Sequence, residues 1–169
     1  MLTRFYDIDG GSITLDGESI YDIPKKKLRG SIGIVLQDTV IFNDTIMQNI
    51  RYGRLDATDE EVIAAAKTAK VADFAEKMAD GYDTMLTEGG GNLSQGQRQL
   101  IAIARAVLAD PKILILDEAT SSIDTRTEVH IQEAMLALMK GRTSLIIAHR
   151  LSTIRDADKI VVIDGGKGS

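Results

Sequence analysis

The chain has 169 residues, 44% of them hydrophobic and 27% charged, which suits one soluble domain, or a domain with an insertion, with a substantial core. Twenty basic and twenty-five acidic residues give a net charge of -5, which opposes nonspecific binding to nucleic acid. The absence of cysteine excludes disulfides, thiolate metal sites and a cysteine nucleophile. No run approaches the roughly 20 apolar residues of a membrane span, so we expect contact with a membrane only through a partner.

Short apolar runs predict the strands. Residues 13–15 alternate between glycine turns, which indicates a short, half-buried antiparallel strand. The basic cluster at residues 25–29 is expected to be solvated loop. More continuous apolar runs at 32–36, 113–116, 145–148 and 160–163 are typical of a parallel sheet covered on both faces by helices.

Four helical segments separate these strands. Thr58 and Glu61 form a capping-box pattern that opens a helix to about residue 70, and residues 71–78 add another turn or two. After a flexible stretch at 88–92, apolar residues at three- and four-residue steps predict a helix from Ser94 to about residue 109, ended by Asp110 and Pro111. A last helix is expected near Asp124 or Thr125, with a Thr125–Glu128 capping box and with Ile131, Ala134, Met135 and Leu138 buried.

The segment NLSQGQRQL, residues 92–100, leads into the helix that begins near Ser94. A helix that begins at a serine, with a glycine two residues on, directs free N–H groups and a positive dipole end toward whatever lies in front. Such an end suits an anion. The alternative is an ordinary serine N-cap on a buried helix.

Polar residues follow three of the predicted strands. Asp117 and Glu118 end an apolar strand, at the edge of a parallel sheet where ligands collect, and two adjacent acids there suit Mg²⁺ and phosphate. The alternative is that both acids cap the turn that follows. Gln37 and His149 also end strands; each alone has an unremarkable structural reading, but together these groups fit one phosphate-and-metal site.

This combination resembles the ATP-binding-cassette (ABC) ATPase family. NLSQGQRQL is similar to the family's signature motif, and Gln37, residues 113–118, residues 121–124 and His149 follow in the family's order. The resemblance covers about residues 5–163. The stretches 41–53, IFNDTIMQNIRYG, and 141–154, GRTSLIIAHRLSTI, are similar to ATPase domains of ABC exporters.

The resemblance implies a role for each matched residue. Ser94 and Gly96, within the signature motif Leu93, Ser94, Gln95, Gly96 and Gln97, are expected to contact the γ-phosphate of an ATP held mainly by a second ABC ATPase domain. Asp117 is expected to organise Mg²⁺ together with Gln37, Glu118 to polarise the attacking water, and His149 to hold the γ-phosphate. Asp124 is expected on the seam between the two domains, and Glu88 against the transmembrane domain of an exporter. Gln95 replaces the family's usual glycine, so we expect no positive φ at that position.

The resemblance also implies a domain organisation. We expect an α/β fold, a mostly parallel sheet of P-loop NTPase type with an inserted helical signature subdomain, incomplete at both ends. Residues 1–37 and 110–169 are assigned to the ATPase core, and residues 38–109 to the helical subdomain. The glycine-rich phosphate loop, G-x-x-x-x-G-K-[ST], does not occur in the sequence. We therefore expect a fragment that hydrolyses no ATP alone and that exposes apolar surface where a helix normally covers the sheet.

The leading hypothesis is the ATP-hydrolysing domain of an ABC exporter at the cytoplasmic face of the cell membrane, with ATP and Mg²⁺ as cofactors and no nucleic acid partner. One alternative is an ABC ATPase that acts on DNA or ribosomes without a membrane domain. The other is a non-enzymatic truncated product that acts as a binding module or has no role.

Overall fold

Three parallel strands form the central sheet of the computed structural model, which describes residues 1–36, 38–117, 123–148, 155, 157–165 and 167–168. The strands are β3 (Ile32–Val35), β4 (Ile113–Asp117) and β5 (Thr143–Ile147), with β4 in the middle. Ile34 is in register with Ile115, and Ile115 with Leu145, so these three side chains share one face of the sheet. The expected α/β fold with a parallel sheet is confirmed.

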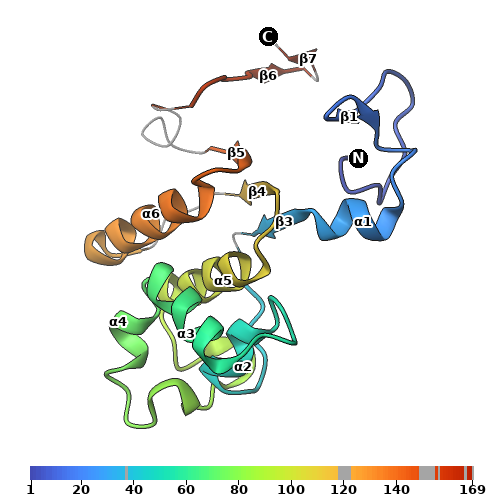
Figure 1. The fold of residues 1–169 in the computed structure, drawn as a ribbon. Helices are drawn as coiled ribbons and strands as arrows, with labels where there is room; N and C mark the ends of the chain where they lie inside the picture. The colour runs from blue at the N-terminus through green and yellow to red at the C-terminus, as the bar shows by residue number, and fades with distance from the viewer. Residues whose placement is uncertain (37, 118–122, 149–154, 156, 166, 169) are drawn as a thin grey trace.

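Helices fill the connections between these strands (Figure 1). The longest are α5 and α6, which precede and follow β4 in the chain. Between β3 and β4 the chain forms a group of helices on the far side of α5 from the sheet (Figure 1). The helices and 3₁₀ turns are α1 (Lys25–Gly30), α2 (Ile46–Arg51), α3 (Asp59–Thr68), α4 (Ala72–Ala75), η1 (Gly81–Asp83), η2 (Glu88–Gly90), α5 (Gln95–Ala109) and α6 (Thr125–Met139).

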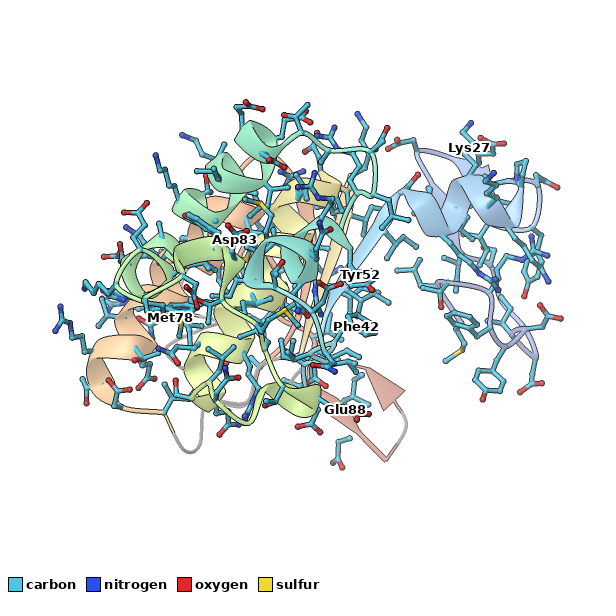
Figure 2. The ribbon with its side chains drawn as sticks, turned by 90° about the horizontal axis from the view of Figure 1, so that it is seen from below. Lys27, Phe42, Tyr52, Met78, Asp83 and Glu88 are labelled. Carbon is cyan, nitrogen blue, oxygen red and sulfur yellow. The ribbon has the colours of Figure 1, made fainter. Side chains whose placement is uncertain are left out.

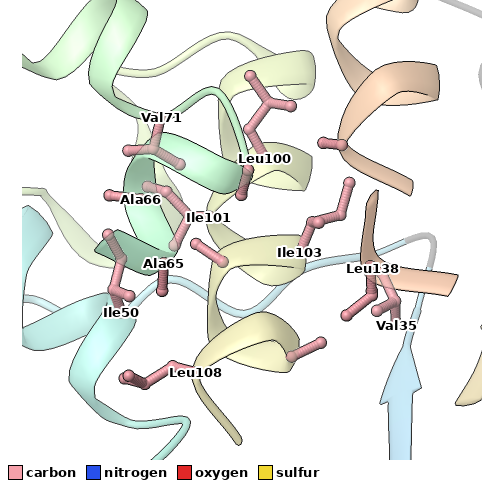
Figure 3. Packing of buried hydrophobic residues seen from close by; sticks show 14 of the residues in the cluster. Val35, Ile50, Ala65, Ala66, Val71, Leu100, Ile101, Ile103, Leu108 and Leu138 are labelled. Carbon is pink, nitrogen blue, oxygen red and sulfur yellow. The ribbon is translucent and has the colours of Figure 1, made fainter. Parts of the chain in front are cut away.

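The largest hydrophobic core joins one face of the sheet to α2, α3, α5 and α6. Val35 of β3 and Leu114 and Leu116 of β4 are buried in it. Ile101 of α5 is fully buried in the same cluster, which also contains residues of α2 and α3 (Figure 3). The apolar stripe predicted for α6 is confirmed, since all four of its expected core residues are buried. Helix α5 therefore packs against helices on one side and against the sheet on the other.

The opposite face of the sheet is only partly covered. On this face Ile32, Ile113 and Ile115 belong to or pack against a second cluster with residues of α1 and the segment before it. On the same face Ile34, Leu145 and Ile147 are 44%, 50% and 53% exposed. Within the described residues the prediction of helices on both faces is therefore confirmed only in part: Leu28 of α1 packs on this face, but no helix covers Ile34, Leu145 and Ile147. The expected exposed apolar surface is present.

The prediction of a fourth parallel strand at residues 160–163 is wrong. Residues 160–162 are not in a strand, and β6 (Ile163–Asp164) pairs antiparallel with β7 (Lys167–Gly168) in a hairpin of its own. The side chains of residues 160–163 are exposed. The chain reverses after Asp164, where Gly165 has φ 54°, so the apolar run ends in a hairpin and adds nothing to the central sheet (Figure 1).

The N-terminal hairpin matches its prediction. β1 (Thr14–Leu15) pairs antiparallel with β2 (Glu18–Ser19) across a two-residue turn, and Asp16 and Gly17 both have positive φ, 49° and 85°. This is the combination that a tight hairpin turn requires.

The basic cluster that follows was expected to be loop, which is wrong. Residues 25–30 form α1 after Pro24, with Leu28 buried while its three lysines stay exposed. Leu28 packs in the second cluster, and the Arg29 guanidinium donates to the carbonyls of Thr3 and Arg4, so both hold this short helix in place.

Capping explains where the helices begin. The Thr58–Glu61 capping box at the start of α3 is confirmed, with both reciprocal hydrogen bonds formed. For α6 the predicted Thr125–Glu128 box is wrong by one residue: Asp124 is the N-cap, and its carboxylate accepts a hydrogen bond from the backbone N–H of Thr127 at 3.0 Å. A carboxylate is at least as good a cap as a hydroxyl, so the helix begins at the earlier residue.

Candidate functional site

The signature motif forms the capped start of α5. The Ser94 hydroxyl accepts a hydrogen bond from the backbone N–H of Gln97 at 3.2 Å, and the Gln97 side chain accepts one from the N–H of Ser94 at 2.9 Å. Ser94 is exposed, whereas Gly96 is buried. Because the box satisfies Gln97, the N–H groups of Gln95 and Gly96, which have no partner within a helix, remain at the positive end of the dipole. The N-cap reading of Ser94 is confirmed, and anion binding stays a prediction.

Two neighbours hold this helix start in place. Leu93 is buried in the main core, and its N–H donates to the Gly90 carbonyl at 2.9 Å. The Arg98 guanidinium donates to the carbonyls of Gly90 and Leu93 at 3.3 and 3.2 Å. Gln95 lies within α5 and is not among the described residues with positive φ, as expected. Leu93 therefore anchors the signature motif through packing, and Arg98 fixes the loop before it.

The segment around Asp124 lies directly against the signature motif. A Cβ placed on Gly96 would be 2.3 Å from Cγ2 of Thr127 and 3.3 Å from Cγ2 of Ile123. The pKa of the exposed Asp124 carboxyl is lowered, first by the hydrogen bond from the Thr127 N–H and then by the Thr127 hydroxyl. Asp124 is therefore an anion held at the start of α6, beside the start of α5.

The metal and water residues predicted at the strand ends are only partly described. Asp117 is the last residue of β4, pairs in register with Ile147 and is half-buried. Gln37, Glu118 and His149 lie outside the described residues. The strands that precede them, β3, β4 and β5, are parallel and adjacent, so their carboxyl ends meet at one edge of the sheet. Among described residues no group of three His, Asp or Glu could hold a metal ion.

Sequence reasoning missed a buried polar network behind the signature helix. Asn49 of α2 is fully buried, and its amide donates to the carbonyls of Phe42, Asp44 and Thr45 and accepts from the N–H of Phe42. Arg105 of α5 donates to the Asn49 carbonyl at 2.6 Å, to its side-chain oxygen at 2.8 Å and to the Val40 carbonyl at 2.6 Å. The available signal was an arginine within the apolar run of residues 100–109, which is costly unless it is paired.

This network joins α5 to the segment after residue 37. Burial lowers the pKa of the Arg105 guanidinium, whose plane also lies 5.3 Å from the ring centre of Phe42. The helices touch nearby, since a Cβ on Gly53 would be 2.2 Å from the Arg105 carbonyl oxygen. A single helix thus carries the signature motif at its start and supports the segment after Gln37 near its end.

An aromatic pair is exposed beside this network. The rings of Phe42 and Tyr52 are 4.3 Å apart, and both side chains are at least two-fifths exposed. Gly89 donates its N–H to the Ile41 carbonyl at 3.2 Å, which holds the loop with Glu88 beside Phe42. Figure 2 shows Tyr52, Phe42 and Glu88 on the same side of the molecule. We call Phe42, Tyr52 and Glu88 the aromatic–acidic patch.

A parallel sheet with an acid at the end of its central strand, next to a helix with a capped and exposed N-terminus, defines a nucleotide-binding domain of the P-loop NTPase type. The chain belongs to the ABC transporter family, whose sequence model matches residues 1–121. The predicted resemblance is confirmed.

Individual relatives match nearly the whole chain. The uncharacterized ABC transporter ATP-binding protein YfiC of Bacillus subtilis (strain 168) is 60% identical over 99% of this chain and 28% of its own length. The ATP-dependent lipid A-core flippase of Syntrophus aciditrophicus (strain SB) is 53% identical over the same shares. A structure of a bacterial Atm1-family ABC exporter with ATP bound has a TM-score of 0.88 and 51% identity, covering 98% of this chain and 29% of that one. The chain therefore spans less than a third of these relatives.

Proposed function

We propose that the chain is part of the ATP-binding domain of an ABC exporter, in which ATP hydrolysis between two such domains drives transport across the membrane. The observation that carries the proposal is the signature motif on the capped, exposed start of α5, beside Asp124. The similarity to an Atm1-family exporter and to a flippase over 98–99% of the chain supports the exporter assignment. We place the domain at the cytoplasmic face of the cell membrane.

The start of α5 fits a phosphate group of ATP. It offers the exposed Ser94 and the N–H groups of Gln95 and Gly96 at the positive end of a 15-residue helix. We assign Ser94 and Gly96 to the γ-phosphate of a nucleotide bound by the second domain, with Leu93, Gln95 and Gln97 shaping that surface.

The end of β4 fits the metal side of the same chemistry. Asp117 supplies a carboxylate oxygen, the ligand type that Mg²⁺ prefers, at the sheet edge where ligands of parallel sheets collect. Bound Mg²⁺ supplies charge neutralisation for the phosphates. We assign Asp117 and Gln37 to hold it, Glu118 to orient and deprotonate water, and His149 to hold the γ-phosphate. Asp124 then lies on the seam with the second domain.

The aromatic–acidic patch is our candidate for contact with the transmembrane domain. Exposed Phe42 and Tyr52 offer apolar area, Glu88 offers a charge, and Arg105 links the patch to the signature helix. Asn49 exchanges hydrogen bonds with the Phe42 backbone and accepts two from Arg105, so it connects the patch to α5. No helix in the described part of the chain is long and apolar enough to cross a bilayer.

The test is ATP hydrolysis by the complete transporter, reconstituted in lipid, with and without Glu118→Gln. A well-placed base contributes about 10²–10⁴-fold, so the variant should lose at least about a hundredfold in kcat while it still binds ATP. Glu133→Gln, at a half-exposed glutamate in the middle of α6 that pairs with Lys70, is the matched control. Full activity of the Glu118→Gln transporter would show that Glu118 does not activate the attacking water. Stimulation of the unsubstituted protein by DNA or ribosomes alone would favour an ABC ATPase that acts on DNA or ribosomes without a membrane domain.

A further inference from the structure

Gly96 is placed where a helix would ordinarily carry a side chain. Glycine is among the least favourable residues inside a helix, and Gly96 has no positive φ that would require it. Its neighbours supply the reason. A Cβ there would be 2.3 Å from Cγ2 of Thr127, a separation at which one of the two must move. The absence of a side chain at residue 96 therefore lets α6 begin directly against α5.

Thr127 has two branches that face two different groups. Its methyl carbon Cγ2 lies against Gly96. Its backbone N–H donates to the Asp124 carboxylate at 3.0 Å, and its hydroxyl is a further hydrogen-bond partner that lowers the pKa of Asp124. Because a β-branched side chain is stiff at χ1, the rotamer that seats the methyl also sets the direction of the hydroxyl.

We propose that Thr127 is a positioning residue that fixes Asp124 to the start of the signature helix, through its methyl against Gly96 and its backbone N–H on the carboxylate at 3.0 Å, with its hydroxyl beside the same carboxylate. The proposal rests on the proposed function, which assigns Asp124 and the signature motif to one interface with the second ATPase domain. Ile123, on the other side of Asp124 in the sequence, also packs against this site, since its Cγ2 is 3.3 Å from a Cβ placed on Gly96. The signature motif and Asp124 then meet the second domain as one rigid edge.

Two substitutions separate the branches. Thr127→Val keeps a methyl over Gly96 and removes the hydroxyl, whereas Thr127→Ser keeps the hydroxyl and removes the methyl. In the complete transporter, Thr127→Val should lower kcat for ATP about tenfold, the scale expected for a displaced group at a reacting interface, with KM for MgATP changed by less than about twofold. Thr127→Ser should retain kcat within about threefold. Thr125→Val is the matched control on the exposed first residue of α6 and should behave as the unsubstituted protein.

A second measurement tests the contact between the Thr127 methyl and Gly96. Gly96→Ala should lower the urea midpoint of the 169-residue chain, and Thr127→Ser in the same chain should restore most of that loss, because the closest atom to the new methyl is removed. Thr125→Ser in the Gly96→Ala chain should restore nothing. Gly30→Ala, where a Cβ meets nothing within 4 Å, should leave the midpoint unchanged or raise it.

The two measurements distinguish failure of the positioning role from failure of the proposed function. Unchanged kcat in Thr127→Val, or a Gly96→Ala midpoint that Thr127→Ser does not restore, overturns the positioning role. If the unsubstituted transporter hydrolyses no ATP, the proposed function fails, and the urea measurement still decides whether Thr127 and Gly96 are in contact.

Discussion

The helices α2–α5 and the strands β3–β5 differ in how completely they bury their apolar side chains. The helices bury apolar residues against one another, and their buried Asn49 makes hydrogen bonds through both its side-chain oxygen and its nitrogen. The sheet buries Val35, Leu114 and Leu116 on one face, while part of the other carries exposed Ile34, Leu145 and Ile147. The comparison teaches that the signature helix is held chiefly by the helical side and by the buried sheet face. Changes on the open face should leave its position intact.

The largest expected effect contrasts the two sheet faces. Leu114→Ala, on the buried face, should lower the free energy of unfolding by about 2–5 kcal/mol, since it leaves a cavity in the main core. Leu145→Ala, on the open face, should cost less than about 1 kcal/mol, because half of that side chain is already in water. Urea denaturation of both variants measures the contrast, and equal losses would mean that the open face is covered in solution.

The open face also predicts self-association of the 169-residue chain. An exposed apolar surface beside strand edges favours contact between copies. Replacing Ile34, Leu145 and Ile147 together by threonine keeps β propensity and removes most of that apolar area. Sedimentation velocity should show oligomers for the original chain and a monomer for the variant; a monodisperse original chain would contradict the prediction.

The second effect tests the helical side. Asn49→Ala removes an amide that bonds to three carbonyls, and it leaves Arg105 with one partner fewer. Unpaired buried polar groups cost about 1–3 kcal/mol each, so we expect a loss of about 2–4 kcal/mol in urea denaturation. Asn92→Ala, at an exposed asparagine that bonds to Met85 and Thr87, is the matched control and should cost under about 1 kcal/mol. Similar losses in the two variants would show that the network does not stabilise the helices.

A smaller effect concerns the start of the signature helix. Ser94→Ala removes the cap on Gln97 and should cost about 1 kcal/mol in unfolding free energy. Thr58→Ala removes the equivalent cap of α3 and should cost the same. In the complete transporter only Ser94→Ala should also impair ATP hydrolysis. If both variants lower activity alike, Ser94 contributes a cap and no phosphate contact.

The smallest expected effect is a loss of unfolding free energy at low pH. The Arg142 guanidinium donates to Asp110 at 2.5 Å and holds the pKa of that carboxyl below its usual value of 3.8. Because the pKa of Asp110 is lower in the folded chain than in the unfolded chain, its ionised carboxylate stabilises the fold at a pH above the unfolded-state pKa. This stabilisation is lost as the pH falls through the folded-state pKa. Because Asp110 is largely exposed, we expect less than about 1 kcal/mol. Asp110→Asn should remove the difference in unfolding free energy between pH 5 and pH 3 that this pair contributes, and an unchanged pH profile would contradict the assignment.

Helices α3, α5 and α6 were the easiest part to predict, for local reasons, whereas α1 was expected to be loop and α2 was not predicted. The start of α5 and the four buried residues of α6 follow from the sequence because caps and periodic apolar positions lie within a few residues of each other. The shift from Thr125 to Asp124 at the start of α6 arose because two adjacent residues were both good caps. Such choices depend on the loop before the helix, which the periodicity does not describe.

Long-range pairing was harder. Residues 160–163 have the composition of a buried strand yet lie exposed, since pairing depends on a partner distant in sequence. Arg105 and Asn49 were missed for the same reason: their residues are 56 positions apart, and only the fold brings them together. The signature motif was predicted because it is contiguous, whereas the contact of Gly96 with Thr127 required the packing of two helices.

The contact of Gly53 with the Arg105 carbonyl has a genetic consequence. Any side chain at residue 53 would meet backbone, which cannot turn aside as a flexible side chain can. In a library that contains every amino acid at residues 51–56, codon 53 should therefore accept only glycine, while exposed neighbours such as Leu55 vary freely. Selection on this codon would act through the spacing of α2 and α5.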